Sequence, residues 1–235
     1  PYFVGGITDV PGGATDNRGL FYGLDAEPLL LGGQQLPGLP AVLSTGNTIS
    51  FDYRFSAQGT NYIGEVETVE SSASNNYLVV NGAPLLVGGQ IVGEGRPVPA
   101  AAGGLPGESW ANFDFAGITE SGLTMFTGDT NAATSEDEIV VVGGQVVMRE
   151  GDYVGDVVQV TGSISGAYLN EDGDYAVAWE ITESRDALLL NGEVLLLEGN
   201  SVDLDGDGLQ EDGTEITAFT GISSLVLSDR EPDGT

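Results

Sequence analysis

The sequence predicts an all-β fold made of four repeats of four antiparallel strands, most simply arranged as a small four-bladed β-propeller. The first observation is the 37 glycines, many of them in GG, NG, GD and DG pairs that are typical of turns between short strands. The second is that no segment keeps helical periodicity over three turns. The third is a pattern of apolar runs and turns that returns four times along the 235 residues.

Each repeat is predicted to begin with two strands, which we name A and B. Strand B starts at a glycine, continues through two residues to an apolar pair, and closes with threonine after an acid. Three copies fit this pattern: GTNYIGEVET from Gly59, GLTMFTGDT from Gly122 and GDYAVAWEIT from Gly173. The runs that precede them, FDYRFSAQ, FDFAGITES and ISGAYLNED, predict strand A.

Two further strands, C and D, are predicted to form a hairpin after each strand B. Their copies are YLVVNGAPLLVGGQ, IVVVGGQVVMREGD and ALLLNGEVLLLEGN, and a looser fourth copy, GLFYGLDAEPLLLGGQ, begins at Gly19. Type I′ turns need positive φ at both central residues. Three pairs favour such turns: Asn81-Gly82, Gly143-Gly144 and Asn191-Gly192.

The fourth repeat is predicted to be divided between the two ends of the chain. PYFVGGIT, at the start, matches strand B but lacks its glycine, which DGT supplies at the end. Joined, the two ends read G-T-P-Y-F from Gly234, which matches G-T-N-Y-I from Gly59. The four glycines are then 63, 51, 61 and 60 residues apart around a circle of 235, and GISSLVLSD from Gly221 is the missing strand A.

These matches predict a single repeat domain over 1–235, with blades 47–90, 110–152 and 157–200 and a fourth blade from 216–235 plus 1–34. Residues 1–8 would pair with 221–229 and close the ring, which removes two exposed sheet edges. Two alternatives stay open. Strand A of one copy could instead complete the sheet of the next copy, in a strand-exchanged array that builds filaments. The chain could also be one segment of a longer repeat protein.

The charge of the chain is strongly negative, −30 from 36 acidic residues against six arginines. Such a field repels polyanions, and no apolar run reaches the roughly 18 residues of a membrane span, so we expect no nucleic-acid partner and no membrane insertion. Cysteine and histidine are absent, which excludes thiol catalysis, Cys/His metal sites and histidine-based acid–base catalysis. A charge of this sign suits a medium rich in salt or divalent cations, where it is screened.

The segment LNEDGDYAVAW places Asn170, Gly173 and Ala176 in N-x-x-G-x-x-A spacing. It resembles the NxxGxxAF tandem repeat of bacterial exported proteins with varied C-terminal anchors. The repeat at Gly122 departs from that pattern, with Thr119 in place of the asparagine. The resemblance implies export and a β-propeller-like module at the cell surface, and it brings no catalytic residues with it.

The stretch SVDLDGDGLQEDGTE, from Ser201, predicts a calcium loop. Its aspartates stand at positions 1, 3 and 5 of the calcium-loop pattern, and a glycine supplies the sharp turn at position 6. Position 12 is Thr214 rather than glutamate, so Asp212 or Glu215 has to close the coordination shell. Crowded aspartates repel one another unless a cation lies among them, so we expect Ca²⁺ here; the alternative is a solvated acidic connection between strands D and A. The candidate ligands are Asp203, Asp205, Asp207, Leu209 through its carbonyl, Glu211 and Asp212.

Other polar motifs are predicted to be turns. NEDGD (170–174) fits the turn between strands A and B better than an ion site, and SEDE (135–138) and ESRD (183–186) fit solvated turns between B and C. Arg54, Arg96 and Arg149 stand apart, so no arginine cluster predicts a phosphate or sialic-acid pocket. Six aromatic residues are expected in the core between blades, with a sugar-stacking surface as the alternative: Tyr2, Phe3, Tyr62, Trp110, Phe126 and Trp179.

The sequence therefore favours a non-enzymatic extracellular or cell-surface protein, structural or adhesive, that Ca²⁺ stabilises. Copies of itself, joined through the terminal strands, and surface glycans are the partners to consider. The alternative is a carbohydrate-binding or glycoside-cleaving β-propeller, since none of the 36 acids is singled out as a catalytic pair.

Overall fold

The protein is built almost entirely of β-strands in a computed structural model that describes residues 2–7, 17–25, 27–45, 53–71, 74–155, 158–203, 214–217, 219 and 225–229. Within these residues the one helical element is a 3₁₀ turn, η1 (Ala100–Ala102). No helix in the described part of the chain is long and apolar enough to cross a membrane. The predicted all-β class is confirmed.

The strands form antiparallel sheets whose order follows the sequence. The first sheet contains β1 (Tyr2–Ile7), β2 (Asn17–Tyr22) and β3 (Glu27–Leu31). The second contains β4 (Arg54–Phe55), β5 (Tyr62–Glu67), β6 (Asn76–Val80) and β7 (Ala83–Pro84), followed by a small hairpin of β8 (Leu86–Val87) and β9 (Gln90–Ile91). The third contains β10 (Ala116–Ile118), β11 (Thr124–Asp129), β12 (Glu138–Val142) and β13 (Gln145–Arg149). The fourth contains β14 (Tyr153–Val154), β15 (Val158–Leu169), β16 (Tyr175–Ile181), β17 (Arg185–Leu190) and β18 (Glu193–Leu197).

We number the repeats 1 to 4 after these sheets. Repeats 2, 3 and 4 contain the predicted A–B–C–D order as β4–β7, β10–β13 and β15–β18. Strand D of repeat 2 is short, because Pro84 has no amide proton to donate to the ladder. Strand β14 is an addition that the sequence pattern did not predict.

The predicted hairpin turns between strands C and D are confirmed. Asn81 and Gly82 have φ of 50° and 79°, and Asn191 and Gly192 have φ of 51° and 79°. Asparagine suits the first position because its side chain also accepts a hydrogen bond from the start of strand B. Asn81 Oδ1 accepts the Tyr62 amide at 2.9 Å, and Asn191 Oδ1 accepts the Tyr175 amide at the same distance.

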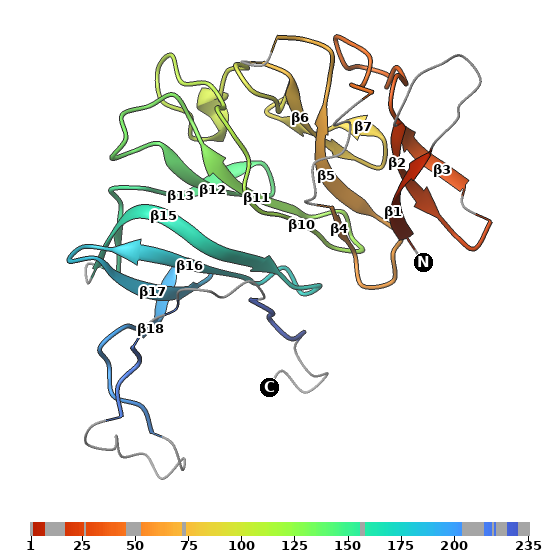
Figure 1. Ribbon diagram of the computed structural model, residues 1–235. Helices are drawn as coiled ribbons and strands as arrows, with labels where there is room; N and C mark the ends of the chain where they lie inside the picture. Colours follow the sequence, from red (N-terminus) through yellow and green to blue (C-terminus); the bar gives the residue numbers. More distant parts are fainter. Residues whose placement is uncertain are drawn as a thin grey trace.

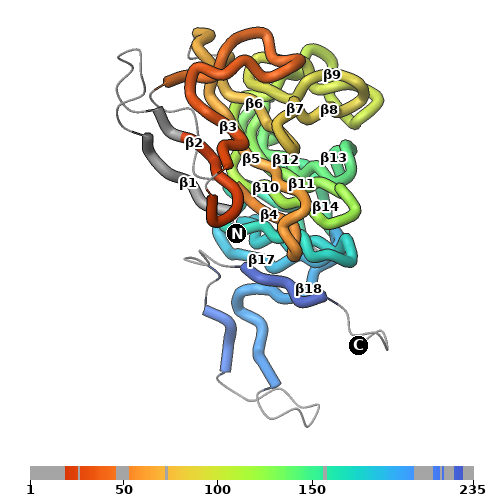
Figure 2. Tube along the Cα trace, turned by 90° about the vertical axis from the view of Figure 1, so that its right-hand side faces the viewer, coloured from red at the N-terminus to blue at the C-terminus, as the bar shows by residue number. Residues whose placement is uncertain are grey.

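The sheets follow one another along an arc, each packed on the next (Figures 1 and 2). Strand β6, which is strand C of repeat 2, shows why strand C is apolar at successive positions. In β6, Tyr77 and Val79 pack toward repeat 1, whereas Leu78 points the other way and packs toward repeat 3. Successive side chains of a strand leave opposite faces, so a sheet covered on both faces needs apolar residues in every position.

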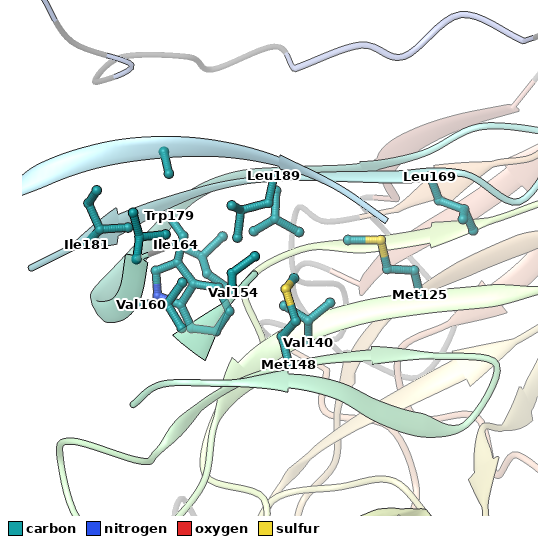
Figure 3. Close-up of a cluster of buried hydrophobic side chains, with 13 residues drawn as sticks. Met125, Val140, Met148, Val154, Val160, Ile164, Leu169, Trp179, Ile181 and Leu189 are labelled. Carbon is teal, nitrogen blue, oxygen red and sulfur yellow. The ribbon is translucent and has the colours of Figure 1, made fainter. Parts of the chain in front are cut away.

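The core between repeats 3 and 4 shows the same packing (Figure 3). Val140 of β12 packs there with Met125, and Trp179 and Leu189 come from the facing sheet. Four of the aromatic residues expected in the core are buried: Tyr62, Trp110, Phe126 and Trp179. Tyr2 and Phe3 lie on β1, whose side chains are outside the described part of the structure.

Among the described residues, the first sheet has strands B, C and D, and β1 pairs with β2 alone. The predicted pairing of 1–8 with 221–229 is not formed by residues 225–229, which are not in a strand. They are held elsewhere, by hydrogen bonds to the turn between β15 and β16. The remaining positions of the predicted strand, 221–224, lie outside the described residues.

Candidate functional site

The predicted calcium loop is mounted on a short two-stranded stem. Ser201 and Glu215 form an antiparallel bridge, and the Val202 amide donates to the Thr214 carbonyl at 2.9 Å. The Ile216 amide donates to the Asn200 carbonyl at 3.0 Å, so Ile216 belongs to the stem rather than to strand A. The stem extends away from the sheets in both views (Figures 1 and 2). The loop ends are therefore pinned together before any ion binds.

Of the predicted calcium ligands, the structure describes Asp203, at the end of the stem that lies away from the sheets. Asp205, Asp207, Leu209, Glu211 and Asp212 lie outside the described residues, so their approach to one another stays a prediction. Among the residues that the structure does describe, no group of three or more Asp or Glu side chains is arranged to hold a metal ion.

The turns between strands A and B gather at one place and exchange hydrogen bonds. The Asn61 side chain, from the turn 56–61 of repeat 2, donates to the carbonyls of Thr119 and Glu120 in the turn of repeat 3, both at 3.0 Å. In return, the Glu120 carboxylate accepts the Gln58 amide at 2.5 Å. Hydrogen bonds from the turn of repeat 2, first of all from Ser56, hold the pKa of Glu120 below its usual value.

Glu171, in the turn 170–174 of repeat 4, links three of these turns. Its Oε1 accepts the Ala57 amide of repeat 2 at 2.7 Å, and its Oε2 accepts the Glu120 amide of repeat 3 at 2.6 Å. Residues 228–229 continue the pattern. Asp229 Oδ1 accepts the Glu171 amide at 2.8 Å, and the Asn170 side chain donates to the Ser228 carbonyl at 2.9 Å.

The A strands of repeats 2, 3 and 4 border a small central cavity of about 90 Å³. Arg54, Ile118 and Leu169, from β4, β10 and β15, are among the residues that line it. Each strand contributes the positions just before its turn, so the three repeats present equivalent residues to one central space. The A strands and the A–B turns of three consecutive repeats therefore meet around one small cavity.

A row of acidic residues crosses repeat 3 at the end of its strands that lies opposite the A–B turn. It consists of Asp129, Glu138 and Glu150. Asp129 of β11 lies directly opposite Glu138 of β12, and the Glu150 amide, just after β13, donates to the Glu138 carbonyl at 2.8 Å. Glu138 is 7% exposed, and its Oε1 has no hydrogen-bond partner among the described residues. Burial, and then the nearby charge of Asp114 and Asp129, raises the pKa of Glu138 to about 9. Sequence reasoning placed Glu138 in a solvated turn, and that was wrong.

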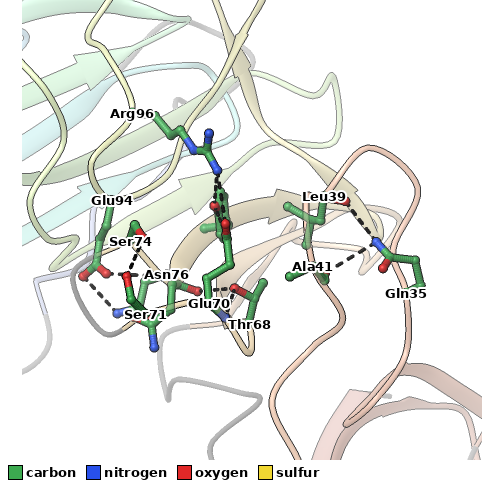
Figure 4. Close-up of polar contacts among 12 residues, drawn as sticks. Gln35, Leu39, Ala41, Thr68, Glu70, Ser71, Ser74, Asn76, Glu94 and Arg96 are labelled. Atoms are coloured by element: carbon green, nitrogen blue, oxygen red, sulfur yellow. Dashed lines mark hydrogen bonds and ion pairs between the residues drawn. The ribbon is translucent and has the colours of Figure 1, made fainter.

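Buried Arg149 pairs with buried Glu108 through two hydrogen bonds, Nη1–Oε1 at 2.6 Å and Nη2–Oε2 at 3.0 Å. Burial acts to raise the pKa of Glu108, but the bonds from Arg149 and from the Leu105 amide outweigh it and hold that pKa below its usual value. The two residues are 41 positions apart, and nothing in the sequence predicted their contact. Arg96 also has partners, Tyr77 at 2.8 Å and Glu70 at 3.5 Å (Figure 4).

The NEDGD segment is a structural turn, as predicted. Asn170 Oδ1 accepts the Asp174 amide at 2.8 Å, and its carbonyl accepts the Gly173 amide at 3.2 Å. Asp174 Oδ1 in turn accepts the Asn191 side chain of the C–D hairpin at 2.8 Å. The asparagine of the N-x-x-G spacing therefore closes the A–B turn and also reaches the terminal segment.

No family model, curated protein or solved structure matches this chain. Any function therefore has to be argued from its own residues.

Proposed function

We propose that this chain is a non-enzymatic structural or adhesive module of the extracellular space or cell surface, folded as a closed four-bladed ring and stabilised by Ca²⁺. The observation that carries the proposal is the docking of residues 228–229 on the turn at 170–171. That contact continues, one repeat further, the contacts by which the turns of repeats 2, 3 and 4 hold one another. A fourth turn in this position is what a ring of four repeats needs.

The closing step would bring strand A of repeat 1 onto the free edge of β1. Residues 225–229, LVLSD, align with the end of strand A in the other repeats, with Ser228 and Asp229 at the positions of Thr119 and Glu120. Within the described part of the chain no strand pairs with the outer edge of β1, and an open sheet edge favours the addition of one more strand. A segment already tethered at the centre of the ring has little chain entropy left to lose when it pairs.

The calcium part of the proposal rests on the stem. A loop that presents three aspartates is costly to order by itself, because the carboxylates repel one another. The Ser201–Glu215 bridge holds its two ends together and lowers the cost of forming a site. Since the stem leads through 217 toward the terminal segment, an ordered loop would also restrict where residues 225–229 can lie.

The surface role rests on charge. A net charge of −30 keeps copies apart at low salt and lets divalent cations bring them together. The alternative of a carbohydrate-binding or glycoside-cleaving propeller gains nothing from Tyr62, Trp110, Phe126 and Trp179, because these rings are buried and offer no stacking face.

Electron microscopy combined with light scattering, in calcium and in chelator, tests the proposal. Ring-shaped particles of single-chain mass would support the closed form. Filaments would mean that strand A passes between copies, which keeps the structural role but overturns intramolecular closure. A monomer that hydrolyses glycosides would overturn the non-enzymatic proposal altogether.

A further inference from the structure

The chain passes from each repeat toward the next through the same small hydrogen-bonded unit, which we call a junction. A glycine donates its amide to the carbonyl of an apolar residue further along the chain, and that apolar residue donates its own amide back to the carbonyl just after the glycine. The glycines all have positive φ: Gly33 (77°), Gly95 (69°), Gly151 (89°) and Gly199 (86°). Their acceptors, which we call the junction residues, are Leu43 at 2.9 Å and Trp110, Val160 and Ile216 at 2.8 Å. The return bonds, of 2.9–3.1 Å, end on Gln34, Arg96, Asp152 and Asn200.

The first three junction residues are covered by strand B of the following repeat. Each forms an antiparallel pair with a residue at the end of that strand: Leu43 with Thr68, Trp110 with Thr130 and Val160 with Ile181. Leu43 and Val160 are 0% exposed and Trp110 is 2% exposed. A junction therefore does more than turn the chain, because it also receives the end of a neighbouring strand.

The fourth junction residue, Ile216, differs from the other three. It makes both junction bonds, but within the described part of the chain it pairs with no strand B, and it is partly exposed. The following repeat in a ring is repeat 1, whose strand B is β1. The first sheet and the stem that contains Ile216 lie at opposite ends of the arc of sheets (Figure 1). One end of the arc thus has a junction without a strand B, and the other has a strand B without a junction.

The register of the sheets identifies the residue of β1 that corresponds to Thr68, Thr130 and Ile181. In every repeat, one residue of strand C pairs with the residue two positions before the junction glycine: Gly19 with Leu31, Tyr77 with Gly93, Ile139 with Arg149 and Ala187 with Leu197. On the other side, these strand C residues pair with strand B at Gly5, Val66, Gly128 and Trp179. In repeats 2 to 4, the partner of the junction residue lies two positions further along strand B. The same step in repeat 1 leads to Ile7, the last residue of β1.

We propose that the ring closes by docking of β1 on the junction of repeat 4, with Ile7 paired to Ile216 of the same chain. This pairing rests on the closed ring proposed above and supplies the contact that closes it. A partner in the same chain is favoured because Glu171 already joins the turns of repeats 2, 3 and 4 around one centre. The stretch that contains strand A of repeat 1 is then held at both ends, by Ile216 before it and by Ser228 and Asp229 at its turn.

A backbone hydrogen bond beside the pair specifies the same register. The residue after the junction residue donates its amide to the strand B carbonyl just before the partner: Ser44 to Glu67 at 2.8 Å and Ala111 to Asp129 at 2.9 Å. The corresponding bond at the closing junction runs from the Thr217 amide to the Gly6 carbonyl. Because such bonds flank the pair and do not join its two members, Ile7 and Ile216 form a non-hydrogen-bonded pair, with Cα atoms about 4.5 Å apart.

Disulfide trapping tests the pairing. The parent has no cysteine, so two introduced cysteines report on one contact alone. A Cα separation of about 4.5 Å lies within the range that disulfides span, roughly 4.4–6.8 Å. The Ile7→Cys, Ile216→Cys variant should therefore form one disulfide within a single chain, measured by mass spectrometry and by non-reducing electrophoresis. Ile7→Cys, Thr217→Cys is the matched control and should stay reduced, because neighbouring side chains of an extended segment leave opposite faces.

The outcomes separate this pairing from the ring itself. Ring-shaped particles of single-chain mass in which Ile7→Cys, Ile216→Cys stays reduced would overturn the pairing and leave the ring intact. Disulfides between chains would overturn both the same-chain pairing and the closed ring. Hydrogen exchange on the monomeric parent gives a second test if the cysteine variants fold poorly. Slow exchange of the Thr217 amide supports its bond to Gly6, and exchange at the rate of an unfolded chain would overturn the proposal.

Discussion

Repeat 1 and repeats 2 to 4 have the same B–C–D meander but differ in what lies beside strand B. In the complete repeats, strand A covers that edge, as in the pairing of β10 with β11 or β15 with β16. In repeat 1, the described residues leave β1 with β2 as its partner. Strand A therefore makes two kinds of contact in a complete repeat. It pairs with strand B at the edge of its own sheet, and the turn that follows it forms hydrogen bonds with the neighbouring repeat. Ser228 and Asp229 make the second kind of contact, with the turn of repeat 4, although the described residues of their segment, 225–229, form no strand beside β1.

The largest effect is expected from removing the segment that would complete repeat 1. Deletion of residues 221–235 takes away the contacts to Asn170 and Glu171 and leaves β1 as a permanent open edge. We expect aggregation or loss of assembly, measured by light scattering and size-exclusion chromatography. Deletion of 230–235 alone is the matched control, since it keeps the described contacts. A 221–235 deletion as stable and soluble as the parent would show that the terminal segment does not belong to repeat 1.

The next largest effect is expected from calcium removal. An ion at Asp205 and Asp207 would stabilise the folded chain by roughly 2.7 kcal/mol at a hundredfold excess over Kd. Chelation should therefore lower the melting temperature of the parent and leave an Asp205→Ala, Asp207→Ala double variant unchanged. Titration calorimetry that detects no calcium uptake at millimolar concentration would refute the site.

Glu171→Ala tests the contacts between the A–B turns without removing any segment of the chain. The substitution removes the carboxylate that accepts the amides of Ala57 and Glu120, and it keeps every strand. Loss of two charge-assisted hydrogen bonds at a partly exposed position should cost about 2 kcal/mol in urea unfolding. Glu193→Ala, at an exposed hairpin position of the same repeat, should cost far less. Equal losses would mean that the turns are not what joins the repeats.

The smallest of these effects concerns the hairpins. Gly82→Val forces a β-branched residue into φ of 79°, which should cost about 1–2 kcal/mol through left-handed backbone strain. Gly23→Val, in the longer turn of repeat 1, also has positive φ, but a Cβ there meets nothing within 4 Å. Comparing the two by thermal unfolding separates the strain of the backbone from the contact with Tyr62, whose hydroxyl lies 3.4 Å from the added Cβ at Gly82. An unchanged melting temperature for Gly82→Val would contradict a tight turn.

The hairpins and the repeat order could be predicted from the sequence because their cause is local. Asn-Gly and Gly-Gly pairs select positive φ wherever they occur, and the adjoining apolar runs then have to pair with each other. The N-x-x-G turn at Asn170 is a similar case, since its hydrogen bonds join residues three and four positions apart. The contacts between the A–B turns could not be predicted from the sequence. Glu120 and Glu171 are 51 residues apart, and nothing in the residues around either one indicates that they meet.

By itself, the sequence determined that this chain forms short antiparallel strands in repeats and carries a large negative charge. Only the tertiary structure decided which of the 36 acidic residues are buried. Glu138 looks like any surface glutamate in SEDE, yet it is buried opposite Asp129, while Glu108 is buried against Arg149. Burial depends on what the neighbouring repeat places over a residue, and that is fixed by packing between sheets rather than by the order of residues along one strand. Burial raises the pKa of Glu138, whereas the pKa of buried Glu108 stays below its usual value because Arg149 binds its carboxylate.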